Sequence, residues 1–272
     1  MLFDTHAHVN FNAYKNDSPE VIKRSLDAGV FMINVGSQYS TSKRAVEMAE
    51  KHEEGVYAAV GLHPMHLETG LVKIKGDPDE VLFETTEEDF DYIRYKALAQ
   101  NNKVVAVGEI GLDYYWRPKT KARQELFKEK QRVILEKQID FAQELNLPII
   151  FHCRMAHNEL IEILEKRIGV RGTVHCFTGI WEQAQKYLEM GFYLGVNGII
   201  FKMDIKETIE KAPLDRILLE TDCPYLTPSP MEGRNEPIYI KYVAEEVAKI
   251  KKLNYEEIAE ATTQNAKKLF KI

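Results

Sequence analysis

Cysteine is scarce in this chain, and its thiols are not paired in the sequence. The 272 residues include three, Cys153, Cys176 and Cys223, and no Cys-x-x-Cys pair occurs. This pattern excludes the common cysteine-based zinc sites and redox-active dithiols, and an odd number of distant thiols argues against a disulfide framework. We therefore expect reduced thiols in a protein of the cytoplasm.

Long hydrophobic runs are also missing. No stretch approaches the roughly 18 consecutive apolar residues of a membrane-spanning helix, and the start, Met1-Leu2-Phe3-Asp4, lacks the basic and apolar parts of a secretory signal. The glycine-rich phosphate-binding loops G-x-G-x-x-G and G-x-x-x-x-G-K-[ST] are absent as well. We therefore expect no membrane association and no nucleotide cofactor.

Acidic residues outnumber basic ones, but the excess is local. The net charge is −6, and segment 77–91 alone carries eight acidic side chains and no basic one. Removing these eight charges from −6 leaves +2 for the rest of the chain. Because charge effects between exposed groups fall off over roughly 8 Å at physiological ionic strength, the composition stays compatible with a polyanionic substrate.

Short apolar runs alternate with helical patterns along the chain, as in parallel strands joined by helices. We predict a single (β/α)8 TIM-like barrel over residues 1–272, with an irregular acidic surface segment at about 71–86. A doubly wound open sheet is the alternative, disfavoured by the missing glycine-rich loop. After a first strand ending in His6-Ala7-His8, the predicted strands are 31–35, 56–60, 104–107, 149–151, 173–175, 192–195 and 217–219.

Metal-ligand side chains follow several predicted strands. In a parallel barrel the carboxyl ends of the strands meet at one face, where active sites form. A lone histidine is usually a hydrogen-bonded core residue, but four histidines and two carboxylates at this face suit two divalent cations about 3.5 to 4 Å apart. These residues are His6, His8, Glu109, His152, His175 and Asp222.

Glu109 is the predicted bridge, because it ends a buried strand and Gly108 before it permits close approach of the backbone. One cation, which could be zinc, magnesium or manganese, would be held by His6, His8 and Asp222, and the other by His152 and His175. Glu109 and Asp222 are the predicted catalytic residues. Asp222 would accept a proton from the attacking water, since one of its oxygens stays free when the other binds metal.

Six short motifs occur in order along the chain: FDTHAH at 3–8, GLHP at 61–64, GEIGLDYY at 108–115, HCFTG at 175–179, ETDCPYL at 220–226 and RNEP at 234–237. Together they resemble the TatD-type metal-dependent deoxyribonucleases of the amidohydrolase superfamily. The resemblance implies a TIM-like barrel, two divalent metals bound as assigned above, and hydrolysis of phosphodiester bonds in DNA. Two positions depart from the family's pattern: Met155 stands where the family commonly has an acid, and Gly233 where it tends to carry a lysine.

Side chains near these motifs are candidates for contacts with a substrate. Arg154 and Arg234 could grip phosphate, since a guanidinium fork matches two phosphate oxygens, and a loop salt bridge is the competing interpretation. Tyr114, with the two aromatic residues after it, could stack on bases or simply pack. His63 could donate a hydrogen bond to substrate or belong to a simple turn, while Asp113 is expected to orient a metal ligand.

We therefore predict a binuclear metal-dependent hydrolase that cleaves DNA as an exonuclease, on single strands or duplex ends. The first alternative is a hydrolase of small amides, lactones or esters, which a lysine in place of Glu109 would favour. The second is a non-catalytic, metal-stabilised interaction module, which a site closed to water would favour. The residues leave the choice between DNA and RNA open.

Overall fold

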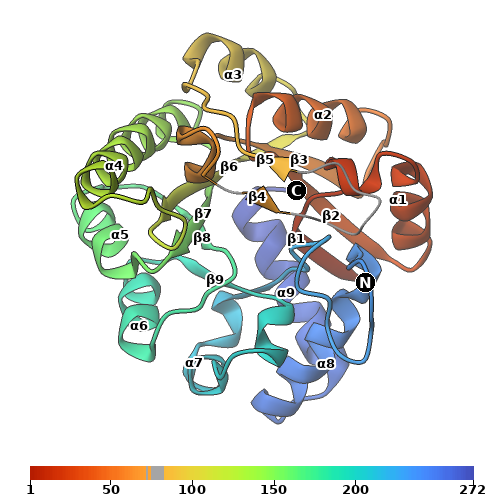
Figure 1. The fold of residues 1–272 in the computed structure, drawn as a ribbon. Helices are drawn as coiled ribbons and strands as arrows, with labels where there is room; N and C mark the ends of the chain where they lie inside the picture. The colour runs from red at the N-terminus through yellow and green to blue at the C-terminus, as the bar shows by residue number, and fades with distance from the viewer. Residues whose placement is uncertain (72, 75–82) are drawn as a thin grey trace.

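Eight parallel strands form one sheet that curves into a barrel (Figure 1). The computed structural model describes residues 1–71, 73–74 and 83–272. Each barrel strand pairs in parallel with the next one along the chain, so the predicted (β/α)8 barrel is confirmed. The strands are β1 (Leu2–Ala7), β2 (Val30–Val35), β3 (Val56–Val60), β6 (Val104–Asp113), β7 (Ile149–Arg154), β8 (Gly172–Val174), β9 (Tyr193–Val196) and β10 (Ile217–Leu219).

The barrel closes between β10 and β1 through a few specific hydrogen bonds. The Thr5 hydroxyl donates to the carbonyl oxygen of Leu219 at 3.1 Å. Just beyond β10, the backbone amide of Asp222 donates to the carbonyl of His6 at 2.8 Å. These bonds align the end of β1 with the segment after β10, and so bring His6 and His8 beside Asp222.

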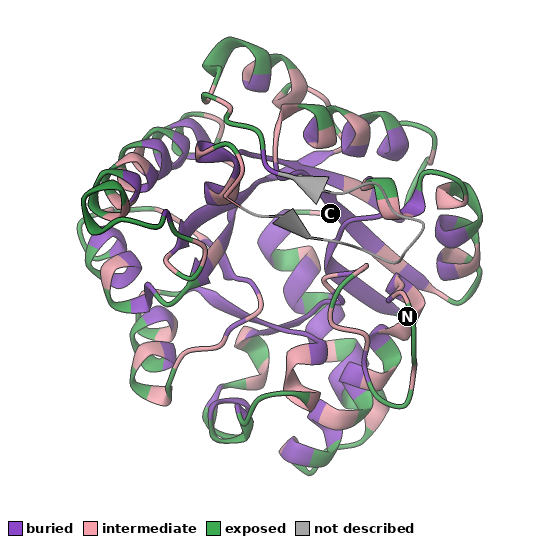
Figure 2. Ribbon diagram, in the orientation of Figure 1, coloured by how far each residue is buried: buried purple, intermediate pink, exposed green. Residues whose placement is uncertain are grey.

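Helices cover the outside of the barrel and bury the face that packs on the strands (Figure 2). No helix of the described residues is long and apolar enough to cross a membrane. The helices are α1 (Ser18–Asp27), α2 (Tyr39–Ala49), α3 (Tyr92–Ala99), α4 (Lys121–Glu144), α5 (His157–Leu164), α6 (Trp181–Glu189), α7 (Lys206–Lys211), α8 (Ile240–Lys251) and α9 (Tyr255–Phe270), and the short 3-10 turns include η1 (Asn12–Tyr14), η2 (Pro64–Leu67), η3 (Gly198–Phe201), η4 (Leu214–Arg216) and η5 (Pro237–Tyr239).

The last helix, α9, closes one end of the barrel and lies near the middle of Figure 1. A capping box fixes its start, because Asn254 accepts from the amide of Glu257 at 2.8 Å and Glu257 accepts from the amide of Asn254 at 3.0 Å. Leu269 and Phe270 at its other end pack with lumen side chains such as Phe3. Since the amino-terminal end of the barrel is filled, the carboxyl ends of the strands form the open face, which we call the mouth.

The segment predicted to be irregular at 71–86 differs from that expectation. Lys73–Ile74 (β4) and Phe83–Glu84 (β5) form a short antiparallel pair, with Ile74 opposite Phe83. The prediction of irregular structure is therefore wrong at these four positions, since β-branched and aromatic residues favour strands even within an acidic stretch. Residues 72 and 75–82 lie outside the described residues.

Candidate metal centre

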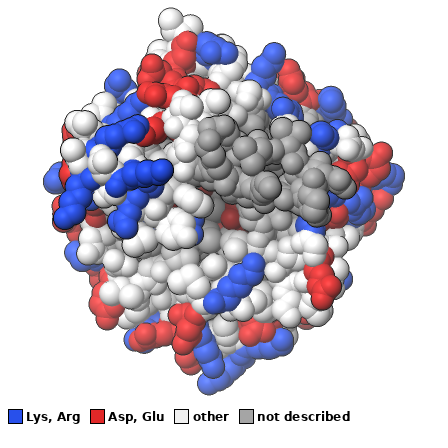
Figure 3. Space-filling model, in the orientation of Figure 1, with Lys and Arg blue, Asp and Glu red and all other residues white. Residues whose placement is uncertain are grey.

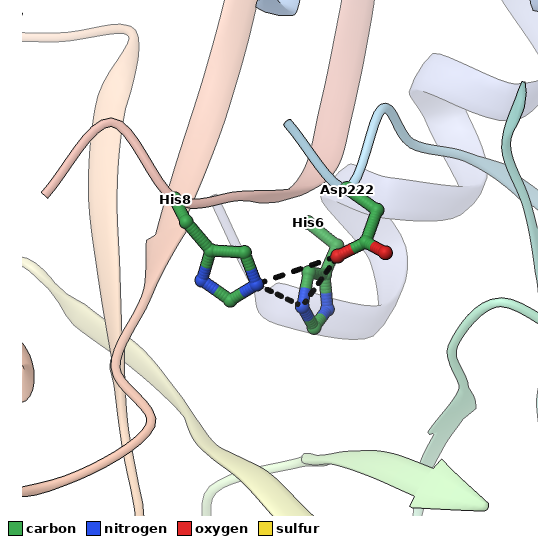
Figure 4. Close-up of side chains that lie close together, drawn as sticks. All are labelled: His6, His8 and Asp222. Carbon is green, nitrogen blue, oxygen red and sulfur yellow. Dashed lines mark hydrogen bonds and ion pairs between the residues drawn. The ribbon is translucent and has the colours of Figure 1, made fainter. Parts of the chain in front are cut away.

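His6, His8 and Asp222 form a first group of metal-ligand atoms at the mouth (Figure 4). The Nε2 atoms of His6 and His8 lie 3.1 Å apart, and Oδ1 of Asp222 lies 3.4 Å from Nε2 of His8 and 3.8 Å from Nε2 of His6. Residues two apart in an extended segment project to the same side, which explains why both imidazoles face Asp222. The structure thus brings these three predicted ligands together.

A bulge in β6 carries Glu109. The pairing of β6 with β7 shifts register between Gly108 and Ile110, so Glu109 is the extra residue. Bulges near active sites re-aim a side chain, and here the carboxylate faces the histidines at the mouth. Glycine is required before it, because a Cβ on Gly108 would lie 2.7 Å from Cβ of Ile150 on β7.

The carboxylate of Glu109 lies between two groups of histidines. Its Oε2 atom is 3.6 Å from Nε2 of His6 and 4.0 Å from Nε2 of His8. Its Oε1 atom is 2.8 Å from Nδ1 of His152 and 2.9 Å from Nε2 of His175. One oxygen therefore faces each group, which is the arrangement that a bridging carboxylate requires.

Asp113 contacts the ring nitrogen of His152 that does not face Glu109. Its Oδ2 lies 3.1 Å from Nε2 of His152, while its Oδ1 accepts from the amides of Tyr115 at 2.9 Å and Trp116 at 3.1 Å. Burial lowers the pKa of His152, but the hydrogen bonds to Asp113 and Glu109 raise it to about 9. Asp113 thus has the geometry of the orienting residue that the sequence predicts.

Glu220 is a buried carboxylate that the sequence analysis did not single out. Its Oε1 accepts from the amide of Cys176 at 2.6 Å and from Nδ2 of Asn197 at 3.1 Å, and it lies 3.2 Å from Nδ1 of His175. It therefore orients a predicted metal ligand. The sequence did contain a signal for Glu220, because this residue directly follows the strand β10 and stands two residues before the predicted ligand Asp222.

The histidines of the site differ in protonation. Burial lowers the pKa of His175, but Glu109 and Glu220 raise it well above its usual value, so a cation would displace a proton from this ring as it would from His152. Nδ1 of His8 lies 2.8 Å from the carbonyl oxygen of Val35, which can only accept, so Nδ1 donates this hydrogen bond and Nε2 is the atom that faces the ligand group. His175 offers Nδ1 to Glu220 in the same way. Burial and the neighbouring His175 lower the pKa of His6, which keeps that ring neutral. Metal ligation needs neutral imidazoles held at a fixed orientation, and His8 and His175 are each held through Nδ1.

The spacing of the ligand atoms also fits a divalent cation. Nitrogen ligands about 2.0–2.1 Å from zinc lie roughly 3.3 Å from one another in a tetrahedral site. The first group has separations of 3.1, 3.4 and 3.8 Å, which bracket that value. Nδ1 of His6 is buried and has no hydrogen-bond partner among the described residues, so Nε2 is the atom that this ring directs at the group.

Comparisons with known proteins agree with this geometry. The family model described as TatD related DNase matches residues 3–271. A Bacillus subtilis protein named uncharacterized metal-dependent hydrolase YabD is 43% identical, and the match covers 100% of both chains. The chain belongs to the TatD-related DNase family. It is a metal-dependent hydrolase of that family.

Other members extend the comparison to a named activity and a solved structure. A Pantoea vagans protein named 3'-5' ssDNA/RNA exonuclease TatD is 30% identical over 100% of both chains. The crystal structure of the TatD homologue YJJV from Escherichia coli superposes with a TM-score of 0.83 at 29% identity, covering 100% of this chain and 98% of the other. The similarity to the TatD-type barrel therefore extends over the whole chain.

At the mouth, an aromatic ring supports Arg154. Met155, the residue after it, is 67% exposed. The guanidinium carbon of Arg154 lies 3.8 Å from the centre of the Tyr115 ring, a cation–π contact. Tyr114 instead packs against the hydrophobic core with Lys128 above its ring, so the geometry favours Tyr115 over the predicted Tyr114 as the ring that a substrate can reach.

His63 lies beside Glu109 and His152, and the sequence predicts that it contacts substrate. Its Nδ1 accepts from the amide of Met65 at 3.0 Å, so Nε2 carries the proton, and Nε2 lies 3.5 Å from Oε1 of Glu109. Burial lowers the pKa of His63 to about 3, so the ring is a neutral hydrogen-bond donor. This form suits a contact with an oxygen of the substrate.

Arg234 is already paired. Its terminal nitrogens bind the carboxylate of Asp17 and lie 3.2 Å from Oε1 of Glu236. Asp17 is the residue before α1, and its side chain caps no helix amide because its carboxylate binds the arginine. This geometry matches the competing salt-bridge interpretation, and phosphate binding by Arg234 stays a prediction.

Proposed function

We propose that this chain is a two-metal hydrolase that cleaves phosphodiester bonds at the ends of DNA strands. The observation that carries the proposal is the position of Glu109, with Oε2 facing His6 and His8 and Oε1 facing His152 and His175. Paired divalent cations that share a carboxylate are characteristic of phosphatases and nucleases. The name of the Pantoea vagans relative supports a nucleic-acid substrate for this chain.

In this proposal the residues divide into two sets of ligands. Zinc, magnesium or manganese would be held by His6, His8 and Asp222 at one position, by His152 and His175 at the other, and by Glu109 at both. When bound, such cations polarise a phosphoryl oxygen and make water a better nucleophile at neutral pH. The protein supplies the fixed geometry and a buried setting in which electrostatic interactions are strong.

Asp222 and His63 are the proposed proton acceptor and hydrogen-bond donor. Burial raises the pKa of Asp222, but the hydrogen bond with His8 and the nearby His175 and His6 lower it below its usual value, so the carboxylate is ionised and can accept a proton from water. His63 would donate from Nε2 to a phosphate oxygen. Arg154, held on the face of Tyr115, would add positive charge beside the phosphate.

The protein would act in the cytoplasm. Its three cysteines are free, and a reducing compartment keeps thiols in that state.

Turnover with defined metals tests the proposed function. The metal-stripped protein is refilled with one cation at a time and assayed on end-labelled single-stranded DNA, duplex DNA, RNA and p-nitrophenyl phosphodiester and ester substrates. We expect metal-dependent release of nucleotides from a strand end. Hydrolysis of the ester without any phosphodiester cleavage would favour the small-substrate hydrolase, and no hydrolysis at all would favour the interaction module.

Metal counting tests the binuclear assignment. Elemental analysis after dialysis against excess cation should approach two per chain, because the two faces of Glu109 each have their own histidines. His152→Ala should lower the count toward one, since it removes a ligand from one side. A stable count of one in the unmutated protein would contradict the shared carboxylate.

A further inference from the structure

Large apolar side chains are exposed around one part of the mouth. One follows each of the strands β6 to β10, at the face where the ligand atoms meet. Exposed apolar groups that gather around a site mark a surface that binds a ligand with apolar parts. These residues are Tyr115, Met155, Ile180, Met203 and Tyr225.

Unpaired basic residues follow directly after Tyr115 and Trp116. Arg117, Lys119 and Lys121 are exposed, and none of them pairs with a carboxylate in the part of the chain that the structure describes. Figure 3 shows lysine and arginine side chains gathered over α4, beside the hollow of the mouth. Aromatic rings next to free cations are the combination that binds single-stranded nucleic acids.

The basic residues at the start of α4 oppose the stability of that helix. The amino end of a helix carries partial positive charge, which favours acidic rather than basic side chains. The first turns of α1, α5, α6, α7 and α9 each contain glutamate, whereas those of α2, α3, α4 and α8 contain no acid, and α4 begins with Lys121. Lys121 therefore gains no stabilisation from the dipole of its own helix.

One carboxylate connects this segment with the metal centre. Oδ2 of Asp113 contacts His152, and its Oδ1 accepts the amides of Tyr115 and Trp116. The aromatic residues are therefore held at a fixed position relative to a predicted metal ligand. Arg154 covers one face of the Tyr115 ring and the Trp116 ring packs against it at a right angle, so a base would stack on the part of the ring that stays exposed.

We infer that segment 115–121 is the track along which a single nucleic-acid strand leaves the metal centre, with a base on Tyr115 and phosphates on Arg117, Lys119 and Lys121. The inference rests on the proposed function and adds to it the path of the substrate. It also gives a preference for single strands, because the bases of a duplex are not free to stack on a side chain.

Tryptophan fluorescence locates the strand. The chain has two tryptophans, Trp116 on the track and Trp181 at the start of α6, so Trp181→Phe leaves a single reporter. The metal-loaded protein is titrated with phosphorothioate oligothymidylate and oligouridylate, which keep their bases and charges but resist hydrolysis. We expect a saturable change in Trp116 emission with either strand, and a much weaker one with blunt duplex at equal nucleotide concentration.

Two matched triple variants test the phosphate contacts. Removing Arg117, Lys119 and Lys121 by alanine should lower the slope of log affinity against log salt concentration by about 2, since each phosphate contact to a single strand contributes roughly 0.7. The control replaces three exposed lysines near the closed end of the barrel that pair with no carboxylate among the described residues, and its slope and turnover should not change. The control residues are Lys51, Lys166 and Lys268.

Tyr115→Ala tests the stacking contact by fluorescence anisotropy of a labelled strand. We expect affinity to fall about 5- to 150-fold, the range for one base on one aromatic ring. If strands are cleaved while Trp116 emission is constant and both triple variants share one slope, the track is wrong and the proposed function stands. If no strand is bound or cleaved, the proposed function itself fails. Equal binding of blunt duplex and single strand would overturn the stacking on Tyr115.

Discussion

At the scale of single residues, the ionisation of Glu109 decides what the site can hold. Burial favours the protonated acid, but the nearby His63 and His175 and the hydrogen bonds from His152 and His175 keep the pKa of Glu109 well below its usual value. A carboxylate that stays ionised has both oxygens available as ligands. The second buried acid, Glu220, uses Oε1 to orient His175 and to accept hydrogen bonds from two further donors. Glu109 is therefore the carboxylate placed to bind metal, and Glu220 the one placed to position a ligand.

Asp222→Asn separates metal binding from proton transfer. The asparagine carbonyl can still contact a cation but cannot accept a proton, so most of the bound metal should remain while kcat falls about 10²- to 10⁴-fold, the scale for losing a general base. Metal content and kcat at saturating metal are measured on the same preparation. If activity falls in proportion to lost metal and returns when more is added, Asp222 is a ligand and another group takes the proton.

Glu220→Gln tests the positioning of His175. The amide keeps the size of the side chain but weakens the acceptor that fixes the ring, so metal affinity should fall about 10- to 100-fold, the usual cost of losing a partner behind a ligand. Competition with a fluorescent chelator gives the affinity, and excess metal should restore much of the activity. Glu182→Gln, an exposed acid on α6, is the control. Unchanged affinity in Glu220→Gln would show that the remaining contacts are enough to orient His175.

At the scale of elements, the sequence predicts the barrel well and some local geometry poorly. Strands and candidate ligands could be predicted because apolar runs and the residues after them are local signals. The bulge at Glu109 could not be predicted, since it depends on the register between β6 and β7. The salt bridge that occupies Arg234 joins residues more than 200 positions apart, and no local pattern encodes such a pair.

Leu269→Ala tests how much α9 contributes by closing the barrel. Leu269 is 4% exposed and packs with lumen side chains, so its truncation leaves a cavity and should cost about 2 to 5 kcal/mol in the free energy of unfolding. Urea denaturation followed by circular dichroism measures this cost. The same change at Leu253, which is 37% exposed between α8 and α9, should have a much smaller effect. Equal effects would mean that α9 is not part of the main cooperative core.

At the scale of the whole molecule, the two ends of the barrel have different tasks. The amino-terminal end is filled by apolar side chains of α9 and supplies stability, whereas the mouth collects buried histidines and carboxylates. Mutations at the closed end should therefore act through folding, and mutations at the mouth through metal and substrate binding. Acid should affect both properties, because several histidines are buried in the neutral state.

His157 connects acidity to stability without being a predicted metal ligand. It is buried near Tyr187, and burial lowers its pKa to about 4, below the value of about 6.5 for an exposed histidine. Between these values the unfolded chain binds a proton that the folded chain does not, so the free energy of unfolding falls as pH drops from about 6.5 to 4. The full shift is worth roughly 3 kcal/mol. Urea midpoints across this range, compared with His157→Gln, should show a shallower pH dependence in the variant, which cannot titrate there. If both proteins lose stability in parallel, the acid sensitivity comes from other groups and His157 does not contribute to it.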